Sequence, residues 1–211
     1  HANPYALKQE LGILGTQLFA TAWGIDRTKI SQRIVTRQPS IGNSQVLPRD
    51  YRNQFEIEIV IKEIGEQVAA RLRHHRKRAG EITLGIGFSY AESQADGRTG
   101  FSQAKRMLPT NRDSDIVTTL REIFRDNWHG EVVRNVAVYT SRLAPDTGEQ
   151  LNFFEPIDHQ IKATNLERTL DAIRNRFGFK ALVYAKSAMH GGTAIQRASL
   201  VGGHNGGNSY D

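Results

Sequence analysis

Hydrophobic residues recur at helical spacing in two long segments of the chain and alternate with polar residues in four shorter ones. From Asn53 to His75 the apolar residues lie three or four positions apart, which predicts an amphipathic helix. A second helix is predicted to begin at Asp113 or Ser114 and to run to about Trp128. Strands are predicted over residues 40–47, 81–90, 100–109 and 131–143. The order β-α-β-β-α-β predicts an α+β fold in which both helices cover one face of a four-stranded sheet.

The predicted strands place very small residues on the face opposite their apolar residues. In the segment 81–90, Thr83, Gly85, Gly87 and Ser89 share this face, and the first and last strands add Ser40, Gly42, Ser44, Asn135, Ala137 and Tyr139. Glycine weakens a strand, so a bare face favours the close approach of another backbone. Because Arg98, Arg106 and Arg134 flank the face, a phosphate backbone is the natural candidate. The alternative is a second packing layer formed by the C-terminal segment.

Two further helical patterns flank the predicted sheet. At the N-terminus, helices are predicted over 4–11 and 16–23, joined by Leu11–Gly15. The glycines allow a tight turn, and a helix beginning near Thr16 offers N–H groups to a phosphate, as in a helix-hairpin-helix; the same pattern also fits an ordinary helix–helix corner. Near the C-terminus, a helical stripe is predicted to begin with a capping box over 164–167 and to stop at Gly178. The stripe consists of Leu166, Leu170, Ile173 and Phe177.

The positive net charge of the chain indicates an anionic partner. The 211 residues carry a formal net charge of +6 and a pI near 9.7. Five basic residues and no acidic one occur between Arg27 and Arg49, in a stretch that reads as a basic linker. The absence of cysteine excludes disulfides, Cys-ligated zinc and iron–sulfur clusters. No apolar run approaches the ~18 residues of a membrane span, and we expect a soluble, cytoplasmic piece of a longer protein.

The pentapeptide Gln150-Leu151-Asn152-Phe153-Phe154 lies in a stretch without a helical or strand period. An amide followed by large apolar side chains is typical of a linear motif that binds in a groove of a partner. The alternative is that the aromatic rings turn inward and build the core.

These segments, in this order, resemble the C-terminal half of a bacterial Y-family translesion DNA polymerase of the UmuC-like branch, which includes UvrX-like members. The resemblance rests on the order of these pieces, from the helix-hairpin-helix and basic linker to the pentapeptide, and covers about residues 4–203. Gly12-Ile13-Leu14-Gly15 with Trp23-Gly24-Ile25-Asp26 is similar to the end of the family's thumb, and Ser40–Ser44 and Arg134–Val138 to strands of its little finger. The pentapeptide is similar to the motif that docks on the replicative sliding clamp, the beta subunit.

The resemblance implies which residues contact DNA and which contact the clamp. The family's thumb hairpin and little-finger sheet hold the phosphate backbone. The DNA-binding residues implied are Gly12, Leu14, Gly15, Thr16, Arg37, Ser40, Gly42, Asn43, Ser44, Arg98, Thr99, Ser102, Arg106, Arg134 and Asn135. Lys105 and its neighbour Arg106 point to opposite faces of the third strand, and Arg106 is chosen for the DNA side. The clamp-binding residues implied are Gln150, Leu151, Asn152, Phe153 and Phe154.

The family's catalytic palm has no counterpart in this sequence. The chain has no adjacent Asp-Glu pair and no HxxxH or HExxH spacing, and Asp113 and Asp115 suit the start of a helix. We therefore expect no catalytic residue, no metal ligand and no cofactor in this chain, which should not extend a primer. The Mg²⁺ ions of a polymerase are expected in the palm of the parent protein.

The sequence thus predicts the DNA-binding and clamp-binding part of an error-prone lesion-bypass polymerase, with DNA, the sliding clamp and other SOS proteins as partners and no membrane contact. The alternative is a stand-alone, non-catalytic DNA-binding module. A nuclease or glycosylase ranks last, because no convincing carboxylate or Lys nucleophile is present. The predicted parts are the thumb end 1–27, linker 28–39, little finger 40–145, clamp-binding segment 146–160, C-terminal helix and extension 161–200, and flexible tail 201–211.

Overall fold

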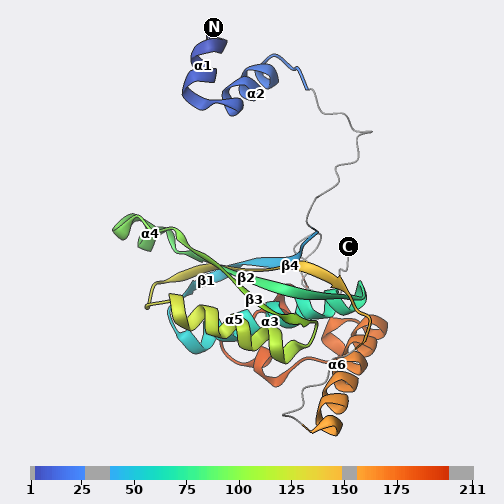
Figure 1. The fold of residues 1–211 in the computed structure, drawn as a ribbon. Helices are drawn as coiled ribbons and strands as arrows, with labels where there is room; N and C mark the ends of the chain where they lie inside the picture. The colour runs from blue at the N-terminus through green and yellow to red at the C-terminus, as the bar shows by residue number, and fades with distance from the viewer. Residues whose placement is uncertain (1–2, 27–38, 149–155, 200–211) are drawn as a thin grey trace. The chain divides into compact units, whose positions relative to one another are not determined.

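The computed structural model describes residues 3–26, 39–148 and 156–199. The chain divides into two units, residues 1–37 and 38–211. The larger unit contains a four-stranded antiparallel sheet in the order β1-β4-β2-β3 (Figure 1). Its strands are β1 (Ile41–Tyr51), β2 (Lys77–Phe88), β3 (Gly100–Thr110) and β4 (Val133–Pro145).

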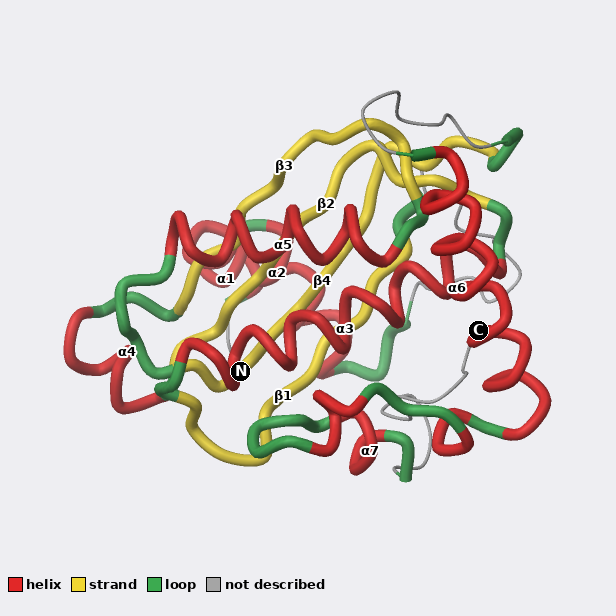
Figure 2. The backbone as a smooth tube through the Cα atoms, turned by 90° about the horizontal axis from the view of Figure 1, so that it is seen from below, coloured by secondary structure: helices red, strands yellow, loops and turns green. Residues whose placement is uncertain are grey.

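Two helices cover one face of this sheet, as Figure 2 shows from the helix side. They are α3 (Gln54–His74) and α5 (Asp113–Asn127). The side chain of Asn53 accepts hydrogen bonds from the first N–H groups of α3, which fixes where that helix starts. Between helices and sheet lies a core of aliphatic residues around Phe124, including the stripe Ile57, Ile61, Ile64, Val68 and Leu72. The predicted α+β fold, with both helices on one sheet face, is confirmed.

The connection between β2 and β3 differs from the prediction, which extended the strand to Tyr90. Strand β2 ends at Phe88, and a short helix, α4 (Tyr90–Asp96), follows. The hydroxyl of Ser89 accepts a hydrogen bond from the N–H of Glu92, so Ser89 is an N-cap rather than a strand residue. Gly97 ends the helix with a φ of 76°, which glycine adopts without strain.

The described C-terminal segment lies against the helices and the β1 edge of the sheet. It consists of α6 (Ile157–Phe177), the 3₁₀ turns η1 (Phe179–Ala181) and η2 (Ala185–Ala188), and α7 (Ala194–Arg197). The carboxylate of Glu63 in α3 accepts hydrogen bonds from the N–H groups of Thr193 and Ala194, and the Tyr51 hydroxyl donates to the carbonyl of Gly191. The alternative of a second layer on the opposite sheet face is therefore wrong for residues 156–199.

Helix α6 begins seven residues before the predicted capping box. Thr164 and Glu167 lie in its buried stripe, with Gln160, Leu170 and Arg174, rather than at a helix start. Leu166 and Phe177, predicted for the buried stripe, are exposed instead. The predicted stop at Gly178 is confirmed, with a φ of 88°. The buried stripe of α6 is mostly polar and packs against charged partners, so it produces no apolar period in the sequence. For this reason the start of the helix was predicted too late in the chain.

The N-terminal unit contains α1 (Pro4–Leu11) and α2 (Ile13–Ala22), separated by Gly12 alone. The predicted first helix is confirmed at both ends, whereas the second begins at Ile13 rather than near Thr16. A φ of 60° at Gly12 turns the chain in a single residue. The predicted five-residue connection is therefore wrong, because Ile13, Leu14 and Gly15 already belong to α2.

Candidate nucleic-acid interface

The face of the sheet opposite α3 and α5, called here the open face, is built from small residues in register. Its central rung crosses the four strands as Ser44, Ala137, Gly85 and Ser102. The next rung on one side consists of Val46, Asn135, Gly87 and Gly100, and the next on the other side of Gly42, Tyr139, Thr83 and Ala104. The alternation predicted for the first, second and last strands is thus confirmed, and β3 presents Gly100, Ser102 and Ala104 on the same face.

Two glycines of the open face leave room for a side chain of the neighbouring strand. A Cβ atom at Gly42 would lie 2.3 Å from Cδ1 of Tyr139, and one at Gly87 would lie 2.9 Å from Cβ of Asn135. A Cβ at Gly85 would meet Ala137 at an ordinary 3.5 Å. The missing side chains of Gly42 and Gly87 therefore let Tyr139 and Asn135 pack closely against the backbones of β1 and β2. These two side chains then project little from the sheet.

One end of the open face is framed by an acidic residue between two arginines. The carboxylate of Glu81 lies 3.6 Å from Nε of Arg106 and 3.3 Å from Nε of Arg142. The hydroxyl of Ser141 donates a hydrogen bond of 2.8 Å to the same carboxylate. This hydrogen bond, with the nearby guanidinium groups, lowers the pKa of Glu81. The cluster keeps a net charge of +1 because two arginines share one carboxylate.

The opposite end of the sheet carries two arginines that are each paired with an acid. Nη1 of Arg98 donates to the carboxylate of Glu131 at 2.9 Å, and the Arg98 guanidinium lies over the ring of Phe88. Nη1 of Arg134 lies 3.5 Å from Oδ1 of Asp50. Burial acts to raise the pKa of Glu131, but the N–H of His129 and the charge of Arg98 lower it. Because strands rise about 3.3 Å per residue, the six positions from Glu81 to Gly87 separate the two basic ends by roughly 20 Å.

The structure corrects one of the predicted sheet residues and confirms the side chosen for another. Asn43 lies on the helix side, where its amide donates a hydrogen bond to Gln67 of α3. It was predicted on the DNA side, but its neighbours Gly42 and Ser44 occupy that face and strand residues alternate. Arg106 shares the open face with Glu81, as predicted. Lys105 points the other way and pairs with Glu122 of α5 at 2.9 Å.

The remaining sheet-side predictions lie on the open face or at its borders. Gly42, Ser44, Ser102 and Asn135 lie within it. Ser40 precedes β1 and Thr99 precedes β3, and both are exposed. Their contact with DNA stays a prediction.

In the N-terminal unit, the predicted phosphate-binding residues differ in exposure. Leu14 and Thr16 are exposed, and Gly12 makes the turn. Gly15 is buried against α1, since a Cβ there would lie 2.0 Å from the carbonyl oxygen of Leu7. Gly15 thus belongs to α2, where it lets the two helices cross closely, rather than to the connection between them. Phosphate binding by Gly12, Leu14, Gly15 and Thr16 stays a prediction.

Several predicted residues lie outside the part of the chain that the structure describes. These are Arg37, most of the predicted linker, the pentapeptide Gln150–Phe154 and the predicted tail. The basic cluster at the end of α3 is described and serves the fold. Arg73 pairs with Asp113 and Asp171, Arg78 pairs with Asp146, and Arg71 donates to the carbonyl of Gly42.

The described residues offer no built metal site and no membrane-spanning helix. Within residues 3–26, 39–148 and 156–199, no group of three or more His, Asp or Glu side chains is arranged so that it could hold a metal ion. The carboxylates of Glu58, Glu63 and Asp113 already accept hydrogen bonds from arginines or backbone N–H groups, so the Mg²⁺ ions of a polymerase do not fit this set. Among the described helices, none combines the length and apolar character needed to cross a membrane.

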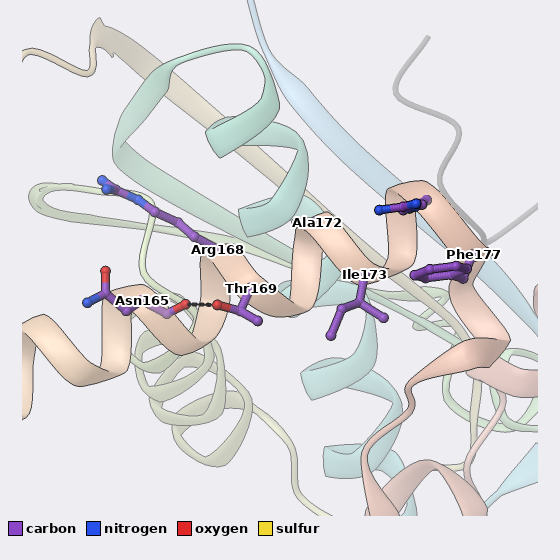
Figure 3. Close-up of a pocket in the computed structure, with 7 residues that line it drawn as sticks. Asn165, Arg168, Thr169, Ala172, Ile173 and Phe177 are labelled. Carbon is purple, nitrogen blue, oxygen red and sulfur yellow. Dashed lines mark hydrogen bonds between the residues drawn. The ribbon is translucent and has the colours of Figure 1, made fainter.

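The pocket of Figure 3 is a surface feature of α6 rather than a substrate cavity. All seven of its described lining residues, from Asn165 to Phe177, belong to that helix. The dashed line in Figure 3 is the hydrogen bond of 2.7 Å from the Thr169 hydroxyl to the carbonyl of Asn165.

Two residues of the open face, Glu81 and Arg142, were missed by the prediction. Glu81 occupies an outward position of the predicted alternation, so the pattern itself could have added it. Arg142 could not be found this way. Its φ of 53° interrupts the alternation near the end of β4 and brings its guanidinium to Glu81.

Comparisons with known proteins find relatives that are named as a DNA repair protein and as DNA polymerases. The chain is 40% identical over 199 residues to "Putative UV-damage repair protein UvrX" of Bacillus subtilis (strain 168), which covers 94% of this chain and 46% of that protein. It is 36% identical over 200 residues to "DNA polymerase IV 2" of the same strain, with coverage of 94% and 47%. The chain spans about half the length of the curated relatives it matches.

A solved structure with a similar chain is titled "Complex of beta-clamp processivity factor and little finger domain of PolIV". The match has a TM-score of 0.40 and 18% sequence identity, and it covers 56% of this chain and 100% of that chain. Residues 38–153, which contain the whole sheet with α3 and α5, match the model of the impB/mucB/samB family C-terminal domain. With more than half of its residues in that match, the chain belongs to the impB/mucB/samB family, and the resemblance to Y-family DNA polymerases predicted from its sequence is confirmed.

Proposed function

We propose that this chain is the DNA-gripping and clamp-binding part of a lesion-bypass DNA polymerase. The observation that carries the DNA part is the open face, on which four strands present small residues in register, with arginines at both ends and a net positive charge at one of them. Family membership supports the same conclusion, since the relatives are named as DNA repair proteins and DNA polymerases. The polymerase reaction and its Mg²⁺ ions belong, in this proposal, to a palm in a longer protein.

The open face is suited to a phosphate backbone rather than to base edges. Its central rung lets a second backbone approach, while the Ser44 and Ser102 hydroxyls and the Asn135 amide offer hydrogen-bond donors. Arg106 and Arg142 add a net positive charge at one end, whereas Arg98 and Arg134 at the other end are each paired with a carboxylate. Contacts to phosphates fix position without reading sequence. A grip of this kind tolerates the distorted bases that a lesion-bypass polymerase meets.

The salt dependence of DNA binding tests this surface with two adjacent residues. Arg106→Gln removes a cation from the open face, whereas Lys105→Gln removes one from the helix side of the same strand. For B-DNA the slope of log K against log salt changes by about 0.9 for each phosphate contact. We expect Arg106→Gln to weaken primer–template binding and to flatten the slope by about that amount, and Lys105→Gln to leave both unchanged. Equal effects of the two substitutions would place the DNA on another surface.

The clamp part of the proposal rests on Gln150–Phe154. Three large apolar side chains next to an amide suit a groove of the replicative sliding clamp, and burying each contributes about 1.5–3 kcal/mol before ordering costs. We expect Phe153→Ala with Phe154→Ala to abolish binding to the purified clamp while folding and DNA affinity stay nearly intact. Unfolding of this variant would show that the rings belong to the core. Undiminished clamp binding by the folded variant would show that the motif is misassigned. Other SOS proteins stay proposed partners.

A further inference from the structure

A buried cluster of charged side chains fixes helix α6 to α3 and α5 within the larger unit. Arg73 of α3 donates to Asp171 of α6 at 2.6 Å and to Asp113 at 2.7 Å, and its guanidinium lies 3.5 Å from Glu167 of α6. Glu167 also accepts the N–H of Asp113 at 3.0 Å. These partners come from α3, from the N-terminus of α5 and from α6, so the helix has one defined place on the unit.

The first two turns of α6 expose two apolar side chains beside its buried stripe. Ile157 is 57% exposed and Ile161 is 45% exposed, whereas Gln160 between them is 2% exposed. Residues four apart lie on one side of a helix, so the two isoleucines form a continuous small patch. β-Branched residues are also weak helix formers, and neither the core nor helix propensity accounts for them at these positions.

The covalent chain places this patch next to the proposed clamp motif. Phe154 and Ile157 are three residues apart, which is at most about 10 Å along an extended chain. A large ring-shaped protein that binds Gln150–Phe154 therefore cannot be far from the first turns of α6. The far end of the same helix is different, since Phe177 lies 20 positions after Ile157, which is about 30 Å at 1.5 Å per residue.

We propose that Ile157 and Ile161 form a second contact with the same sliding clamp that binds Gln150–Phe154. The inference rests on the proposed function. Because α6 is already ordered and directly follows the motif, the second contact adds affinity at little further entropic cost. DNA is the less suitable occupant, since α6 is joined to α3 and α5 on the side of the sheet away from the open face (Figure 1).

The test compares two pairs of exposed apolar residues, one in the first two turns of α6 and one at and just beyond its C-terminal end. Ile157→Ala with Ile161→Ala removes the patch, and Phe177→Ala with Leu182→Ala is the matched control, with exposures of 65% and 40%. Alanine favours a helix, so the first pair should fold normally. Binding of the 211-residue chain to the purified beta clamp of Bacillus subtilis is measured by calorimetry. We expect a roughly tenfold loss for the isoleucine pair, equivalent to about 1.4 kcal/mol, and less than a twofold loss for the control.

A variant with Phe153→Ala and Phe154→Ala separates the two proposals. If this variant loses clamp binding while the isoleucine pair keeps full affinity, the second contact is overturned and the clamp motif stands. If it binds as tightly as the unaltered chain, the proposed clamp motif itself fails. An isoleucine pair that binds clamp normally but alters DNA affinity or self-association assigns the patch to one of those occupants and overturns the inference. Equal losses of clamp affinity in the two alanine pairs would overturn the inference that the contact is made by the first two turns of α6.

Discussion

At the scale of single residues, the open face depends on which side chains are missing. Gly42 and Gly85 share this face and differ only in what lies beside them on β4. Tyr139 occupies the space over Gly42, whereas Ala137 leaves ordinary room over Gly85. Glycine within a strand is costly unless another group approaches closely. At Gly42 the approaching group belongs to the protein itself, and at Gly85 the space remains open to a partner.

Alanine substitutions at these two glycines should separate the two roles. Gly42→Ala introduces a Cβ only 2.3 Å from the Tyr139 ring and 2.7 Å from the carbonyl oxygen of Val138, and the second contact is with backbone that yields little. We expect a loss of about 1–3 kcal/mol in the free energy of unfolding, measured by urea denaturation. Gly85→Ala, at 3.5 Å from Ala137, should be nearly neutral in the same measurement. Similar losses at both positions would mean that Tyr139 moves aside freely.

At the scale of elements, α6 joins the larger unit through charged rather than apolar contacts. Leu170 is the buried hydrophobic residue of its inward stripe, and the other members are Gln160, Thr164, Glu167 and Arg174. Arg73 lies at the centre of the contact with three carboxylates around it. Breaking a buried pair of this kind is expensive, because the charges left behind remain out of water.

Arg73→Met should therefore destabilise the unit strongly, although methionine preserves much of the buried stem. The substitution leaves Asp113, Glu167 and Asp171 without their shared cation, and we expect a loss of about 3 kcal/mol in urea denaturation. Lys105→Met is the control, since its ion pair with Glu122 is half exposed and such pairs contribute about 0–1 kcal/mol. A loss at Arg73 no larger than that at Lys105 would show that the cluster does not hold α6 in place.

At the scale of the whole molecule, two buried carboxyl groups couple stability to pH near neutrality. Burial raises the pKa of Glu66 to about 7, against the attraction of Lys62, and burial together with Asp113 raises the pKa of Glu167 to about 7. In the unfolded chain both groups ionise near pH 4.5, so the folded state binds more protons between about pH 4.5 and 7. The free energy of unfolding must then fall as the pH rises through this window.

Glu66→Gln tests this linkage, since glutamine resembles the protonated carboxyl at every pH. We expect the melting temperature of this variant to fall less than that of the unaltered chain between pH 4.5 and 7. The remaining dependence comes from Glu167 and from Asp113, because burial raises the pKa of each. Carboxyls with lowered pKa values, such as Glu58 and Glu81, act below this window and do not mask it. The exposed control Glu122→Gln should follow the unaltered chain. A Glu66→Gln curve parallel to that of the unaltered chain would assign the pH dependence to other groups.

The sequence alone determined the sheet, its two covering helices and the bare face between basic residues. These follow from local periods: the side chain of every second strand residue shares a face, and the apolar stripe of α3 repeats with the helical turn. The same alternation placed Arg106 and Lys105 on opposite faces of β3, and the structure puts Arg106 on the open face. The alternation also contradicts the placement of Asn43 there, because Gly42 and Ser44 already occupy that side.

Only the tertiary structure decided the position of α6, the pairing of its charges with Arg73, and the burial of Gly15 between two helices. Each depends on residues far apart in the chain, such as Arg73 and Asp171, or on a close contact at a small residue. A small residue in the sequence does not by itself indicate such a contact. Charged residues that are buried together carry no hydrophobic period, so a pattern of apolar positions cannot locate them. Arg142 reached the open face for a related reason, since an irregular backbone angle, which no period predicts, turns it toward Glu81.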